Sequence, residues 1–93
     1  MKSIDIRYKH DMSVTKARKT VQGLVEHLGN KHGVRWHWQD NDLLFERGGV
    51  KGAIHLLPHE VHVRAELGWL MKSYKEAMEE HIKRYLDQNL GHG

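Results

Sequence analysis

The stretch from Val34 to Leu67 most constrains the fold, because short turns divide it into segments that alternate between apolar and polar residues. Two of the turns, Asp40-Asn41 and Gly48-Gly49, consist of residue types that accept the positive φ of a two-residue hairpin turn. A third turn contains Pro58, which fits the first central position of a type I or II turn. The stretch is therefore predicted to form four antiparallel strands joined by tight turns.

The turns also predict which residues face each other across neighbouring strands, with a four-residue loop at Pro58 pairing Leu56 with Val61. One face then carries only apolar or small residues, in two rows: Trp38, Leu43, Ile54 and Val63, then Trp36, Phe45, Gly52 and Ala65. The other face carries a row of charges that alternate in sign: Arg35, Glu46, Lys51 and Glu66. A slip of one residue would bring charges into the core, so the pattern indicates one register.

Segments on both sides of this meander complete the fold. Before it, Ile4, Ile6 and Tyr8 alternate with charged residues, which predicts a fifth, half-buried strand. Ser13 then precedes a helical stripe of apolar residues, and Gly33 is placed to end that helix in a left-handed conformation. The stripe consists of Val14, Ala17, Val21, Leu24, Val25 and Leu28.

After Gly68 the apolar period changes again and predicts a long second helix with one buried face. Its predicted stripe consists of Leu70, Met71, Tyr74, Met78, His81, Ile82 and Tyr85. Lysine and glutamate alternate at four-residue spacing on the outer side, as on a solvated helix surface. Residues 90–93 are expected to fray.

The predicted fold is α+β, with the element order β-α-β-β-β-β-α in one domain spanning residues 1–93. The sheet is expected to be five-stranded and antiparallel with the order 2-3-4-5-1, because the first strand can close against the last. Both helices would cover one face, a reduced version of the helix-grip arrangement by analogy.

Composition excludes several classes of protein. The sequence contains no cysteine, so it has neither disulfides nor thiolate ligands. No apolar run approaches the roughly 20 residues of a membrane-spanning helix, and no secretion signal is visible, so we expect a cytoplasmic protein. The net charge of +3 is spread along the chain instead of forming a basic patch, so no nucleic-acid partner is expected. No phosphate-binding loop and no nucleophile elbow around a serine occurs, so we predict no enzyme and no cofactor.

Two groups of residues are candidate binding sites. Counting from the turns places His55 opposite His62 with Asp42 beside His55, a set that zinc or nickel accepts; surface histidines without a metal role are the alternative. The second group is aromatic and could line an apolar ligand site, although core packing is the default explanation of such a set. It consists of Trp36, Trp38, Phe45, Trp69 and Tyr74. A shallow groove, or a surface completed by a second copy in a homodimer, fits so small a chain better than a large cavity.

Several motifs extend over nearly the whole chain. They are Leu43-Leu44-Phe45-Glu46-Arg47 followed by Gly49-Val50-Lys51-Gly52, then Val61 to Gly68 with the final helix, and Ile6-Arg7-Tyr8-Lys9-His10 with Ala17-Arg18 near the start. Together they resemble one family, the small bacterial polyhydroxyalkanoic acid system proteins. The resemblance implies an accessory or binding role at the polyhydroxyalkanoate storage granule or on a granule-associated protein. It implies no catalytic residues. An acyl-binding module and a metal-binding protein remain the alternatives.

Overall fold

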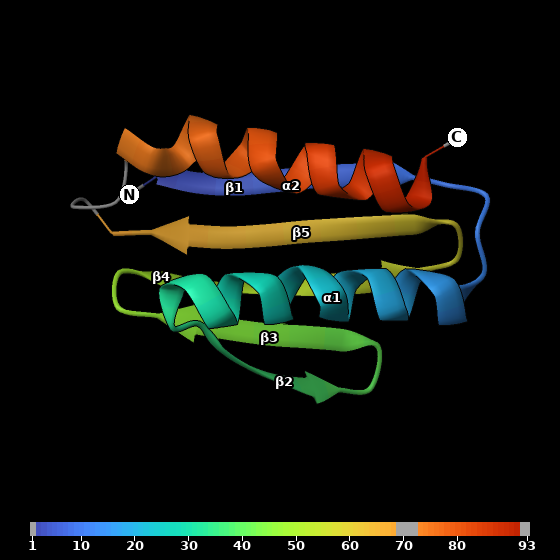
Figure 1. Ribbon diagram of the computed structural model, residues 1–93, viewed down its shortest axis with the longest axis horizontal. Coiled ribbons are helices and arrows are strands. Elements are labelled where there is room, and N and C mark those ends of the chain that lie inside the picture. Colours follow the sequence, from blue (N-terminus) through green and yellow to red (C-terminus); the bar gives the residue numbers. More distant parts are fainter. Residues whose placement is uncertain (1, 69–72, 92–93) are drawn as a thin grey trace.

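The computed structural model describes residues 2–68 and 73–91. Within them the chain forms a sheet with two helices on one side (Figure 1). The elements are β1 (Lys2–Lys9), α1 (Val14–His32), β2 (Arg35–Gln39), β3 (Asp42–Arg47), β4 (Val50–Leu57), β5 (Glu60–Leu67) and α2 (Lys75–Leu90). The sheet is five-stranded with the order β1-β5-β4-β3-β2, and every neighbouring pair is antiparallel. The predicted α+β class, element order and sheet order are confirmed.

The predicted register is confirmed in every row. Trp38, Leu43, Ile54 and Val63 are direct neighbours, as are Trp36, Phe45, Gly52 and Ala65, and the row of alternating charges from Arg35 to Glu66 also forms. Asp40 and Gly49 take positive φ values of 56° and 83° in the first two turns.

The third turn is tighter than predicted. Leu56 pairs with Val61 as expected, but Leu57 also pairs with Glu60, so Pro58 and His59 form a two-residue turn. His59 has a φ of 59°, the sign that the second central residue of a type II turn requires. Proline before it is compatible with that turn type, and the ladder therefore gains one more pair.

Helix α1 begins and ends as its sequence predicts. The Ser13 hydroxyl accepts a hydrogen bond from the Lys16 N–H at 3.1 Å, and Gly33 ends the helix with a φ of 70°. One residue of the predicted stripe differs: Val14 is 41% exposed, because it lies in the first turn beyond the part of α1 that the sheet covers.

Helix α2 buries only part of the predicted stripe. Ile82 is buried and Met78 and Tyr85 pack against the core as predicted, whereas His81 is exposed and Tyr74, at the N-cap, is 56% exposed. Leu86 and Leu90 are buried although the predicted stripe did not include them. Leu90, expected in a frayed tail, is the last helical residue and is 1% exposed. Leu70 and Met71 of the predicted stripe lie outside the described residues.

The helices leave one side of the sheet uncovered. α1 contacts β2, β3 and β4, and α2 contacts β1 and α1, all on the side where the core lies (Figure 1). We call the other side the open face. It consists of Ser3, Asp5, Arg7, Lys9, Arg35, His37, Gln39, Asp42, Leu44, Glu46, Lys51, Ala53, His55, Leu57, Glu60, His62, Arg64 and Glu66.

Candidate functional site

The open face carries an ordered arrangement of charge. Arg7 bonds Glu60 across β1 and β5 at 2.9 Å, and Arg35 lies 3.8 Å from Glu46 across β2 and β3. Three of these four side chains are more than half exposed, and only Glu60, at 18%, is not, so each pair contributes little to stability.

Four titratable residues form a cluster near the middle of this face, which we call the histidine cluster: Asp5, Asp42, His55 and His62. The His62 Nε2 lies 2.7 Å from an Asp5 oxygen, and the His55 Nδ1 lies 2.8 Å from an Asp42 oxygen. The two imidazole rings are side by side, with centroids 5.8 Å apart. His62 is only 8% exposed although no helix covers it, so its neighbours on the open face must shield it.

The bond between Asp5 and His62 fixes which atom of that pair donates the hydrogen bond. The hydrogen bond from His62 is the main reason that the pKa of Asp5 lies below its ordinary value, so this carboxylate is ionised at neutral pH. An ionised carboxylate only accepts hydrogen bonds, so the His62 Nε2–H donates and, in the neutral ring, Nδ1 carries the lone pair. A carboxylate that orients an imidazole in this way occurs behind metal-binding and proton-transferring histidines.

The structure therefore brings the predicted Asp42, His55 and His62 together, and adds Asp5. Both aspartates bond the histidines instead of converging with them. In the described part of the chain, no group of three or more histidine, aspartate or glutamate side chains is arranged to hold a metal ion. The predicted metal site is thus left with two imidazoles as its ligands.

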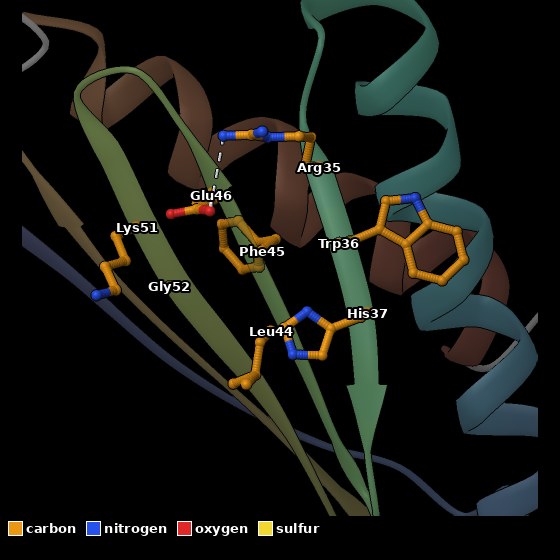
Figure 2. Close-up of a pocket in the computed structure, with 8 residues that line it drawn as sticks. All are labelled: Arg35, Trp36, His37, Leu44, Phe45, Glu46, Lys51 and Gly52. Atoms are coloured by element: carbon orange, nitrogen blue, oxygen red, sulfur yellow. Dashed lines mark ion pairs between the residues drawn. The ribbon is translucent and has the colours of Figure 1, made fainter.

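A hollow of 430 Å³ lies at the other end of β2, β3 and β4 (Figure 2). Its apolar lining includes Trp36, Phe45 and Leu44, while Arg35, Glu46 and Lys51 bring charge to its rim. Trp36 points toward α1 and away from His37 on the same strand. Gly52 also lines the hollow, and the Phe45 ring covers the position that a side chain of Gly52 would take.

The other aromatic residues of the predicted ligand site lie elsewhere. The Trp38 Nε1–H donates to Gln22 at 2.9 Å, and the Arg18 guanidinium lies 3.9 Å from the centre of the Trp38 ring. Trp38 therefore packs under polar side chains of α1. Tyr74 is exposed at the start of α2, and Trp69 lies outside the described residues. Among the members of the predicted set that the structure describes, Trp36 and Phe45 line the hollow.

A comparison with protein families matches residues 4–90 to the polyhydroxyalkanoic acid system proteins. The chain belongs to this family. The match covers both helices and all five strands except the first residues of β1, so the hollow and all of the open face except Ser3 lie within the matched residues. No curated protein and no solved structure shows significant similarity. Within the described residues, no helix of this family member is long and apolar enough to cross a membrane.

Sequence reasoning missed Asp5 as a member of the histidine cluster. The three turns determine how β2, β3, β4 and β5 pair, but no turn joins β1 to β5, so the register of that pair was open. The observed register puts Asp5 beside Arg64 and Arg7 beside His62, which brings the Asp5 carboxylate diagonally to His62. The one sequence signal for Asp5 was the alternation of charged and apolar residues along β1, which places its charged residues on the open face.

Proposed function

We propose that this protein is a non-enzymatic accessory protein of polyhydroxyalkanoate metabolism that acts in the cytoplasm, binding the storage granule or a protein on it through the open face. Membership of the polyhydroxyalkanoic acid system proteins supports the metabolic setting. The observation that carries the binding role is a complete sheet face that no helix covers, with a half-buried apolar centre. Exposed apolar residues that polar residues surround can mark an interaction site.

The chemistry of the open face suits an aliphatic polyester. Leu44 and Ala53 are neighbours at its centre, and Leu57 is 40% exposed toward one end. Arginine, lysine and histidine side chains surround them and can donate hydrogen bonds, whereas ester carbonyls only accept them. A polyester surface offers alkyl groups and carbonyl oxygens together, so both kinds of residue would find a partner.

Co-sedimentation with polyester granules stripped of their native proteins tests this proposal, with polystyrene beads of equal area as the comparison surface. The Leu44→Thr variant removes apolar area from the open face while keeping a residue that favours strands. Val14→Thr is its matched control, because Val14 is also partly exposed but lies on α1. We expect saturable binding that is selective for the granule, weakened by Leu44→Thr and unchanged by Val14→Thr.

The result also separates the two possible targets. Binding to native but not to stripped granules would identify a granule protein as the partner. Equal binding to polyester and polystyrene, or equal behaviour of the two variants, would contradict a role for the open face.

A second candidate function is the binding of a small acyl ligand in the hollow beside Trp36 and Phe45. The observation that favours it is the volume of 430 Å³, which falls within the range of ligand sites although this hollow is open to solvent. Titration with hexanoate should change tryptophan fluorescence in the wild type and in Trp38→Phe, but not in Trp36→Phe. If hexanoate changed the fluorescence of Trp36→Phe as much as that of the wild type, the hollow would be excluded as the site.

A further inference from the structure

The free edge of β1 is the longest unpaired edge of the sheet. β1 has eight residues and β2, at the opposite edge, has five. In an antiparallel pair each residue directs both backbone groups toward the same side, and the side alternates along the strand. The His10 N–H donates to the His59 carbonyl at 2.9 Å, in register with the β1–β5 ladder. Even-numbered residues of β1 therefore bond β5.

The odd-numbered residues of β1 consequently direct their backbone N–H and C=O groups away from the sheet. They are Ser3, Asp5, Arg7 and Lys9, and all four are exposed. Their side chains lie on the open face, where Asp5 and Arg7 carry opposite charges. An edge of this kind can accept another strand, and charged side chains restrict which strand it accepts.

We propose that two copies of this protein pair through β1, antiparallel and centred on Ile6, and join their sheets into one. In this register Asp5 of each copy faces Arg7 of the other, so opposite charges meet on both sides of the two-fold axis. Ser3 faces Lys9, and each of these outward residues exchanges both of its backbone hydrogen bonds. The charge pattern of β1 is therefore complementary to itself.

Neighbouring registers are disfavoured by the same charges. Centring the pair on Asp5 places the two Asp5 carboxylates opposite each other, and centring it on Arg7 does the same with two guanidinium groups. Like charges directly opposite one another destabilise a strand pair. A shift by one residue is excluded because outward residues would then meet residues whose backbone groups already bond β5.

The second edge of the sheet is a poorer candidate. β2 is short, which is one way in which proteins prevent edge pairing. The backbone N–H and C=O groups of Arg35, His37 and Gln39 bond β3. Within β2, only Trp36 and Trp38 therefore direct their backbone groups away from the sheet. No charged residue of β2 would specify a register.

Pairing through β1 has a consequence for the open face. Directly opposed residues of neighbouring strands point to the same side of a sheet, so the open faces of both copies would form one surface. Arg7 of one copy would lie beside Asp5 of the other, which holds His62. Two linked binding faces would increase retention on a granule without any new contact.

Sedimentation velocity of the wild type and of two charge variants tests the pairing. Asp5→Arg leaves two arginines, and Arg7→Asp two aspartates, at the two positions that face each other across the two-fold axis, so each variant alone should lose the dimer. An equimolar mixture should regain it, because arginine of one chain then faces aspartate of the other at both positions. Arg35→Asp is the control, since it breaks a comparable surface ion pair on the opposite edge and should remain dimeric.

Hydrogen exchange on the wild type supplies a test that needs no variant. In the dimer the amides of Asp5, Arg7 and Lys9 should be protected, and they should lose that protection on dilution, whereas the Ile6 amide stays protected in both states. Dimeric wild type with the predicted loss and rescue, or with this alternating protection, supports the proposal. A wild type that is monomeric up to millimolar concentration, single variants that remain dimers, or a mixture that stays monomeric would each overturn it.

Discussion

Gly52 lies where the sheet has no room for a side chain, so Gly52→Ala should destabilise the protein. A Cβ atom at this position would lie 2.5 Å from the Arg64 carbonyl oxygen, 2.7 Å from Cζ of Phe45 and 2.9 Å from Cβ of Ala65. All three distances are shorter than side-chain carbons normally approach. The Arg64 oxygen is backbone of β5 and cannot rotate away, so the strands themselves would have to separate.

The expected magnitude follows from two opposing effects. Overpacking of a closely packed site costs about 1–3 kcal/mol, and the backbone contact places this site near the upper end. Replacing glycine by alanine reduces the entropy of the unfolded chain, which stabilises by about 0.4–1 kcal/mol. The net loss in the free energy of unfolding should be about 2 kcal/mol, or roughly 8–16 °C in Tm for a domain of this size.

Urea and thermal unfolding of Gly52→Ala, followed by circular dichroism, measure this loss. Gly48→Ala is the control, because a Cβ there meets no atom within 4 Å and its φ is not positive. In a Phe45→Leu background the cost of Gly52→Ala should shrink without disappearing, since the Arg64 oxygen remains. Equal stability of the Gly52→Ala and Gly48→Ala variants would refute the reasoning.

Three further predictions concern helix packing and pH. Gly23→Ala places a Cβ 2.7 Å from the Tyr85 hydroxyl, so it should destabilise the wild type. In a Tyr85→Phe variant, which lacks that hydroxyl, Gly23→Ala should instead stabilise the protein by about 1 kcal/mol in urea unfolding, because alanine has the higher helix propensity. Burial, and the bond that the Tyr8 hydroxyl donates to a carboxylate of α2, raise the pKa of Tyr8 to about 12. The protonated Tyr8 hydroxyl therefore contributes fully to stability below pH 10, and this contribution is lost as the pH rises through about 12. In an absorbance titration of the tyrosines, Tyr8→Phe should remove the ionisation step near pH 12. The hydrogen bond from His62 lowers the pKa of Asp5. The ionised Asp5 therefore stabilises the fold above the ordinary aspartate pKa of 3.8, and this stabilisation is lost as the pH falls below that value. The free energy of unfolding, measured from about pH 5 downward, should decline less steeply in Asp5→Asn than in the wild type.

The four-stranded meander was predictable because its information is local. Each turn has residues that favour a tight turn, and each hairpin fixes the register of the two strands beside it. The apolar and charged rows then agree across strands that the turns connect directly. The Pro58 turn shows the limit of this reasoning, since the positive φ of His59, and with it the pair of Leu57 and Glu60, was not predicted.

The second helix was predicted only in part. Four-residue spacing predicts a helix from its sequence, but several overlapping stripes of the same helix contain apolar residues, and the choice among them depends on how the helix lies on the sheet. The predicted stripe correctly included Ile82, but it also contained Tyr74 and His81, which are exposed, whereas packing on β1 and α1 buries Leu86 and Leu90.

By itself, the sequence determined the strands, their order from β2 to β5 and the face that each residue occupies, because turn chemistry and a period of two act between near neighbours. Only the tertiary structure decided what β1 contributes, since β1 and β5 are joined by no hairpin and their register depends on packing between distant segments. That register brings Asp5 to His62, buries a histidine on a face without helices, and leaves the alternating charges of β1 along a free edge.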